Sequence, residues 1–89
     1  MATDASHPLS ENLTAILFDV TDGVGVITLN RPDKYNSCDL ALVTELEHLY
    51  KEIRYDDTVK VVVLTGAGDK AFCTGIDRDF AINALLMAV

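Results

Sequence analysis

The chain has 89 residues, of which 49% are hydrophobic and 24% charged, which is enough for one domain, or part of one, with an apolar core. Its net charge of −7 argues against a nucleic-acid partner or an anionic membrane surface, because both are bound through clustered Lys and Arg. The two cysteines form no C-x-x-C pair and only two histidines accompany them, so we expect no metal site and two reduced, mostly buried thiols.

The first 12 residues are polar and aperiodic. We expect a flexible N-terminal arm over residues 1–12 and one domain, or a truncated part of one, over residues 13–89. The arm carries acidic side chains and no Lys or Arg, unlike a secretory signal or a transit peptide, which predicts a cytoplasmic protein. The apolar tail from Ile82 to Val89 is far shorter than the roughly 20 residues that a membrane helix needs.

Two alternating apolar segments predict a β-hairpin. Strands are expected over residues 13–20 and 24–29, and Asp22-Gly23 between them is a two-residue turn of the kind that hairpins favour. Both faces of the second segment are largely apolar, which predicts a strand covered on both sides. Pro32 cannot donate a hydrogen bond to a sheet, so the chain leaves the sheet before it.

A helix is predicted from about Leu40 to Tyr55, with Asp39 as its N-cap. Its apolar face is expected to consist of Leu42 or Val43, Leu46, Leu49 or Tyr50, and Ile53. Glu45, Glu47 and Glu52 are predicted to be surface carboxylates on the opposite face. Glu47 and Lys51 are spaced for an i,i+4 ion pair.

The run from Lys60 to Thr65 is β-branched and apolar without alternation, which is typical of a central, buried strand. A strand, a helix and a strand in succession predict a parallel pair with a right-handed crossover, so the fold class is α/β with the order β-β-α-β. A further helix is expected from Asp77 to Val89, with Asp77 near its N-cap. Its apolar stripe predicts a surface covered by more polypeptide or by a partner, and consists of Ile82, Leu85, Leu86 and Val89.

Two segments carry a specific pattern. The first is I-T-L-N-R-P-D-K-Y-N-S, residues 27–37, and the second is V-V-V-L-T-G-A-G-D-K-A-F-C-T-G-I-D, residues 61–77. Their order, content and separation resemble the enoyl-CoA hydratase/isomerase (crotonase) family, over roughly residues 14–80. The resemblance implies that the chain is the incomplete, opening β-β-α-β portion of a crotonase-like spiral fold. It also implies enzymes of the lyase or isomerase type that act on acyl-CoA thioesters.

The resemblance assigns an oxyanion donor to the backbone N–H of Ile76, which follows Gly75. In this family negative charge develops on the thioester oxygen, and two aimed N–H groups stabilise it. A glycine before the donor lets the backbone turn and the ligand approach, and a helix that begins directly afterwards adds a favourable dipole. The residue at position 76 is often small in the family, so the bulkier isoleucine predicts a narrower or differently shaped acyl pocket.

The same resemblance implies the substrate contacts. The loop after the second strand would border the CoA moiety, with Lys34 as the candidate for a phosphate contact, and the second segment would line the acyl and pantetheine channel. These substrate-binding residues are Lys34, Tyr35, Asn36, Ser37, Phe72, Cys73, Thr74 and Asp77. No resident cofactor is implied, since coenzyme A is part of the substrate. When complete, a family member is expected to be a homo-oligomer, a trimer or a dimer of trimers.

The family's second donor and its acid/base glutamates come from segments further along the chain. None of Glu11, Glu45, Glu47 and Glu52 is placed for that role, so the 89-residue chain alone is expected to be inactive. One alternative is a non-catalytic fragment that binds CoA or associates with full-length subunits. Another is a Rossmann-like nucleotide module, because Gly66-Ala67-Gly68 and Ala71 fit G-x-G-x-x-A after a strand. Arg31 is expected either to bind phosphate or to form an ion pair within its loop.

Overall fold

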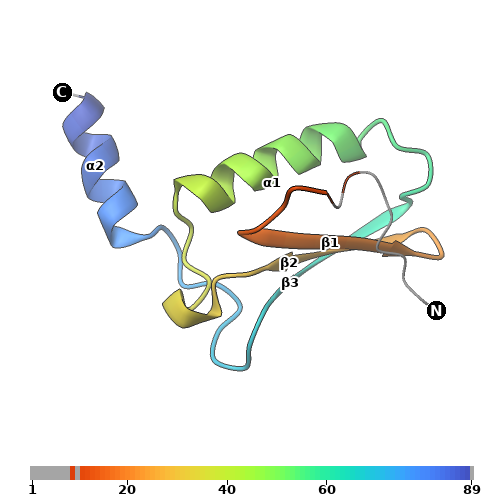
Figure 1. The fold of residues 1–89 in the computed structure, drawn as a ribbon, viewed down its shortest axis with the longest axis horizontal. Helices are drawn as coiled ribbons and strands as arrows, with labels where there is room; N and C mark the ends of the chain where they lie inside the picture. The colour runs from red at the N-terminus through yellow and green to blue at the C-terminus, as the bar shows by residue number, and fades with distance from the viewer. Residues whose placement is uncertain (1–8, 10, 89) are drawn as a thin grey trace.

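The computed structural model describes Leu9 and residues 11–88, so most of the expected N-terminal arm, residues 1–8 and 10, lies outside the described residues. Leu9 packs against the edge of the core. The elements are β1 (Ile16–Thr21), β2 (Val24–Leu29), the short 3₁₀ helix η2 (Pro32–Lys34), α1 (Leu40–Ile53), β3 (Val61–Gly66) and α2 (Arg78–Ala88). Figure 1 shows α1 lying across one face of the sheet, while α2 projects away from it.

The predicted hairpin is confirmed. β1 and β2 pair antiparallel from Ile16↔Leu29 to Thr21↔Val24. Asp22 and Gly23 both adopt positive φ, at 51° and 80°, which is the conformation of the turns that match the twist of hairpin strands. β2 is covered less than expected. Ile27 and Leu29, on one face, are buried, but Val24, on the other face, is exposed.

Helix α1 supplies the other half of the core. Asp39 caps it, as predicted, by accepting the N–H of Leu42 on its carboxylate at 2.9 Å. The helix ends at Ile53, two residues earlier than expected. It packs its apolar face on β1 and β2, and the resulting core consists of Ala15, Ile16, Phe18, Ile27, Leu29, Leu42, Leu49 and Ile53.

Strand β3 pairs parallel with β2, as predicted, from Val24↔Val61 to Leu29↔Gly66. The expectation that it is a central, buried strand is wrong for this chain. The strand order β1-β2-β3 places it at the edge of the sheet, and the side chains of Val61 to Leu64 are 39–56% exposed. A continuous apolar run indicates burial on both faces, but the neighbours that would bury it are not among the described residues.

Glu45 is not a free surface carboxylate, contrary to the prediction. Its Oε1 accepts the backbone N–H groups of Thr14, Ala15 and Ile16 at 3.0, 2.9 and 3.1 Å. Its Oε2 accepts the Thr14 hydroxyl at 3.0 Å. The carboxylate therefore joins α1 to the start of β1. The expected ion pair between Glu47 and Lys51 is present at 3.4 Å on the exposed face of the helix.

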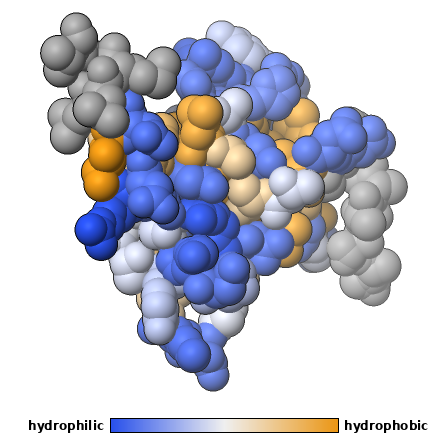
Figure 2. All heavy atoms as spheres, turned by 60° about the vertical axis from the view of Figure 1, so that its left-hand side comes forward, coloured by the Kyte–Doolittle hydropathy of each residue, from blue (hydrophilic) through white to orange (hydrophobic). Residues whose placement is uncertain are grey.

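Helix α2 begins after Asp77, near the predicted position. Its expected apolar stripe can be followed only at Ile82, which is 46% exposed, because the other three side chains lie outside the described part of the chain. The side of the molecule that carries α2 is mostly hydrophilic, with apolar groups in separate small patches (Figure 2). In the part that the structure describes, neither helix is long and apolar enough to cross a membrane.

Candidate functional site

Two loops meet beyond the carboxyl ends of β2 and β3. Parallel strands end at the same edge of a sheet, so the loop after β2, residues 30–39, and the loop after β3, residues 67–77, lie side by side. The two loops contain the later parts of the two motif segments and all ten residues that the sequence assigned to a site. Their contacts determine which of those residues face a ligand and which are committed to the fold.

Asn36 joins the loops. Its side chain is fully buried, and its Nδ2 donates to the carbonyl oxygens of Ala67 and Ala71 at 3.0 and 2.9 Å. Its Oδ1 accepts the N–H of Arg31 at 2.9 Å. Asn36 was expected to border the ligand, but these three bonds occupy both ends of its amide. It acts on any ligand through the loops that it connects.

Gly66, at the end of β3, makes room for this contact. A Cβ at this position would lie 2.4 Å from the carbonyl oxygen of Phe72 and 2.8 Å from Asn36 Nδ2. No side chain fits at those distances, so the glycine is required by the close approach of the second loop to the first.

A single parallel bridge fixes the backbone at Ile76. Cys38 donates its N–H to the Gly75 carbonyl at 2.7 Å and accepts the Asp77 N–H on its own carbonyl at 2.8 Å. In a parallel bridge the residue between these two partners directs its N–H and C=O to the opposite side. No described residue accepts the N–H of Ile76, and its side chain is 59% exposed.

Gly75 makes the bend before Ile76. Its φ of 108° lies in the region that other residues avoid, so a glycine is needed here for its conformation. A Cβ built at Gly75 would have no described atom within 4 Å, so the space beside the bend is open. The N–H of Gly75 donates to the Cys73 sulfur at 3.4 Å.

Asp77 is held by two sets of bonds. Its Oδ1 caps α2 by accepting the N–H groups of Asp79 and Phe80 at 3.0 and 3.1 Å, which agrees with the predicted N-cap. Its Oδ2 lies 3.4 Å from Nη2 of Arg31. The Phe80 N–H, and after it the Arg31 guanidinium, lower the pKa of the Asp77 carboxyl. This carboxylate is therefore ionised at neutral pH, and both of its oxygens already contact other residues of the chain.

Arg31 connects the N-terminal ends of the two helices through ion pairs. Besides Asp77, it reaches the carboxylate of Asp39, the N-cap of α1, at 3.6 Å, and its Nη1 donates to the Ser37 carbonyl at 2.5 Å. The sequence left open whether Arg31 binds phosphate or forms an ion pair. The structure shows ion pairs, with Asp39 and Asp77.

The remaining predicted contacts lie at the surface of the loops. Lys34, Tyr35, Phe72 and Thr74 are exposed, and the Thr74 hydroxyl donates to the Tyr35 carbonyl at 3.4 Å. A small pocket of about 120 Å³ opens between the loops, lined partly by Tyr35, Asp69 and Lys70. Lys70 was not assigned to the site; its place in the K-A-F motif is the signal that could have found it.

Cys73, also expected to line the channel, lies against the other cysteine. Both thiols are free and half-buried, with the two sulfurs 3.8 Å apart. Burial, and then the hydrogen bond with Cys73, raise the pKa of Cys38. The prediction of two reduced, buried thiols did not foresee that they are adjacent. Among the described residues, no cluster of His, Cys, Asp or Glu is arranged to hold a metal ion.

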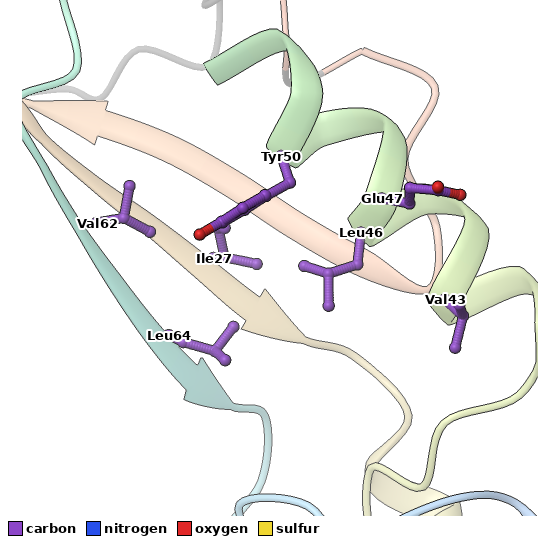
Figure 3. A pocket seen from close by; sticks show the side chains of 7 residues that line it. All are labelled: Ile27, Val43, Leu46, Glu47, Tyr50, Val62 and Leu64. Carbon is purple, nitrogen blue, oxygen red and sulfur yellow. The ribbon is translucent and has the colours of Figure 1, made fainter. Parts of the chain in front are cut away.

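A larger, apolar groove lies between α1 and β3. It has a volume of about 410 Å³, and Figure 3 shows side chains of the helix and of the strands on either side of it. Its lining consists of Ile27, Val43, Leu46, Glu47, Tyr50, Val62 and Leu64. None of the predicted site residues belongs to it, so the groove and the Ile76 bend are separate features.

The loop after β3 does not form a dinucleotide site. A Rossmann fingerprint opens a helix directly at its glycines. Here residues 67–75 form bends and irregular backbone, and α2 begins only at Arg78. The Rossmann-like alternative is therefore not supported by the structure.

Residues 19–85 match the family described as enoyl-CoA hydratase/isomerase. The chain is 53% identical over 57 residues to a probable enoyl-CoA hydratase of Mycobacterium leprae, which covers 64% of the chain and 19% of that protein. It is 42% identical over 62 residues to (E)-benzylidenesuccinyl-CoA hydratase of Thauera aromatica, covering 70% of the chain and 24% of that protein.

The fold is similar to solved structures as well. The crystal structure of an enoyl-CoA hydratase from Bacillus anthracis superposes with a TM-score of 0.77 at 38% identity, over 84% of this chain and 31% of that one. The chain thus spans about a quarter of the length of the curated relatives that it matches, 24% and 19% for the two named above.

Proposed function

The chain belongs to the enoyl-CoA hydratase/isomerase family, and from this membership we propose that it supplies one of two backbone donors that stabilise a thioester enolate during acyl-CoA hydration or isomerisation. The donor is the N–H of Ile76. The observation that carries the proposal is that this N–H is directed away from its bridge to Cys38 and has no acceptor among the described residues.

The surroundings of the bend suit an oxyanion. The open space beside Gly75 gives a thioester carbonyl room to approach, which a side chain at that position would restrict. The 11-residue helix α2 starts two residues beyond Ile76, so its positive end lies near the developing charge. The nearby negative charge of Asp77 is offset by Arg31 at 3.4 Å. A donor fixed in this way needs no reorganisation when charge develops, which is why such groups stabilise transition states.

The exposed residues of the two loops are proposed to hold the rest of the substrate. Lys34, which is exposed on the first loop, and Lys70, which lines the small pocket, offer cations to the phosphates of CoA, while Tyr35 and Phe72 offer aromatic surface. Coenzyme A enters as part of the substrate and no resident cofactor is invoked. Asn36 and Asp77 act as positioning residues, because their side chains are bonded to the fold.

Two glutamates of α1 have carboxylates that are engaged in contacts between described residues. Glu45 binds the start of β1 and Glu47 is paired with Lys51. We therefore propose that the second donor and the acid/base glutamates are contributed by segments beyond those seen here, that the 89-residue chain alone is inactive, and that the complete protein works as a trimer or a dimer of trimers.

The proposal is tested by substitution in a full-length enzyme that carries this segment. Ile76→Pro removes the N–H and is expected to lower kcat/KM by about 10²–10³-fold, the usual cost of one oxyanion donor. Ile76→Ala keeps the N–H and is expected to retain most of that activity. Equal losses in both variants would assign the effect to the side chain and would contradict the proposed role.

A second function is favoured by one feature, the exposed apolar edge of β3 beside the groove. It is non-catalytic: association with full-length subunits, or binding of CoA alone. Thermal unfolding of the chain with crotonyl-CoA and with free CoA, beside an activity assay, separates the two functions. Equal stabilisation by both ligands favours simple CoA binding, whereas greater stabilisation by the thioester favours the oxyanion site.

A further inference from the structure

Two cysteines separated by 35 positions in the sequence meet beside the Ile76 bend. Cys38 forms the bridge that holds Gly75 and Asp77, and Cys73 accepts the N–H of Gly75. Their sulfurs lie 3.8 Å apart and both thiols are free and half-buried, so a small oxidant can reach them. Neither thiol is used in the proposed function.

We propose that Cys38 and Cys73 form a reversible disulfide, and that its formation changes the backbone at Gly75 and Ile76. The oxidant is a low-molecular-weight disulfide, such as oxidised glutathione. The Cys73 thiolate attacks one of its sulfurs, forms a mixed disulfide and releases one thiol. Cys38 then loses its proton to solvent and attacks the Cys73 sulfur, releasing the second thiol. Overall, two protein thiols are oxidised and one external disulfide is reduced to two thiols.

The order of attack follows from the hydrogen bonds. The Gly75 N–H donates to the Cys73 sulfur at 3.4 Å, whereas among the described residues no N–H donates to the Cys38 sulfur. Burial raises the pKa of Cys38, which disfavours its thiolate. Cys73 is therefore the attacking thiol and Cys38 the resolving thiol.

The disulfide is coupled to the bend because both cysteines are bonded to it. A disulfide bond is about 2.0 Å long, so the sulfurs must approach by roughly 1.8 Å from their present 3.8 Å. Cys38 carries the bonds to Gly75 and Asp77, and Cys73 carries the bond from Gly75. Because the space beside Gly75 is open, we expect the bend to move when the two cysteines approach each other. An effect on thioester chemistry would rest on the proposed function, whereas the disulfide itself does not.

The test uses the 89-residue chain and oxidised glutathione, followed by intact-mass measurement. The folded chain is expected to lose two hydrogen atoms, to do so about tenfold or more faster than the same chain in denaturant because folding holds the thiols together, and to recover with dithiothreitol. Stable glutathione adducts, disulfide-linked dimers, or oxidation no faster than in denaturant would overturn the proposal.

Single variants test the order and the coupling. Cys38→Ser is expected to accumulate a mixed disulfide at Cys73, and Cys73→Ser to react more slowly at Cys38; the reverse order would overturn the assignment. In the oxidised wild-type chain, the NMR signals of the Gly75 and Ile76 amides are expected to shift while that of Gly23, in the hairpin turn, stays in place. Unchanged Gly75 and Ile76 signals would overturn the coupling. No measurement here involves a thioester, so the result is independent of the proposed function.

Discussion

Asn36 is the residue on which the contact between the two loops depends. It lies fully buried between them, and its amide donates to two carbonyls of one loop and accepts an N–H of the other. A buried polar group that loses its partners retains the cost of desolvation without compensation. The bend at Ile76 is placed by the second loop, so Asn36 influences the proposed donor indirectly.

Asn36→Asp is expected to destabilise the chain by about 3 kcal/mol, because a carboxylate of the same shape cannot donate to the carbonyls of Ala67 and Ala71. Chemical denaturation monitored by circular dichroism measures this change. Asn83→Asp, at an exposed position on α2, makes the same chemical change as a control and is expected to alter stability by under about 0.5 kcal/mol. Similar values for both variants would show that the buried bonds contribute little.

Asp77 predicts a pH dependence. The Phe80 N–H, followed by Arg31, lowers the pKa of this carboxyl in the folded state. A group with a depressed folded pKa contributes stability above its unfolded pKa of about 3.9, and that contribution is lost as pH falls through the folded pKa. Thermal unfolding at neutral and at acidic pH should therefore show a smaller acid-induced loss of stability in Asp77→Asn than in the wild type. An equal loss in both would contradict the assigned role.

At the scale of elements, α1 is attached to the sheet by a polar contact as well as by its apolar face. The Glu45 carboxylate accepts the backbone N–H groups of Thr14 and Ala15, which directly precede β1, and of Ile16, its first residue. A charged acceptor makes such bonds stronger than neutral ones. The start of β1 therefore depends on a side chain about thirty positions away, 29 for Ile16.

Glu45→Ala is expected to cost about 2 kcal/mol of stability and to raise amide hydrogen exchange at Thr14, Ala15 and Ile16. Glu52→Ala, at an exposed position of the same helix, is the control and should leave that exchange unchanged. If exchange at the start of β1 rose equally in both variants, the effect would belong to the helix as a whole and not to the Glu45 carboxylate.

Features that depend on neighbouring residues were predictable from the sequence. The Asp22-Gly23 turn, the Asp39 cap and the Glu47–Lys51 pair are interactions within a few positions, and each was expected. The role of Glu45 could not be read in this way. Glu45 lies on the polar face of the predicted helix. Only the three-dimensional arrangement brings the backbone N–H groups at the start of β1 to its carboxylate.

At the scale of the whole molecule, one edge of the sheet is exposed and apolar. β3 lies at its edge, with Val61 to Leu64 exposed and the apolar groove beside it. Its apolar pattern predicts burial on both faces, and the matched relatives are about four to five times as long as the aligned region, with 19–25% of each covered. The apolar pattern of β3 therefore indicates burial that the described residues do not supply.

An exposed apolar edge strand predicts self-association of the isolated chain, since its free N–H and C=O groups can pair with another strand. Analytical ultracentrifugation is expected to show an increase in average mass with concentration, and Val63→Lys, on the edge, is expected to reduce it. Thr44→Lys introduces the same charge on the exposed face of α1 and should leave association unchanged. Concentration-independent monomers, or equal effects of both variants, would contradict this expectation.

The candidate site was predictable only through its motifs. The two segments led to the correct family and to the α/β fold, which the match over residues 19–85 and the solved structures confirm. Neither the open direction of the Ile76 N–H nor the adjacency of Cys38 and Cys73 follows from spacing, because both arise from a bridge between loops far apart in the sequence. Similarly, Asn36 and Asp77 were expected at the ligand, and the structure shows their side chains bonded within the fold.

An NMR titration of the ¹⁵N-labelled chain with crotonyl-CoA and, separately, with free CoA tests most directly whether the Ile76 N–H donates to a thioester oxygen. Free CoA has the same nucleotide and pantetheine but no thioester carbonyl. If the Ile76 N–H is an oxyanion donor, its amide signal shifts with crotonyl-CoA and stays in place with CoA, while amides of the loop around Lys34 respond to both. An Ile76 signal that is unmoved by a thioester bound elsewhere on the chain would contradict that role.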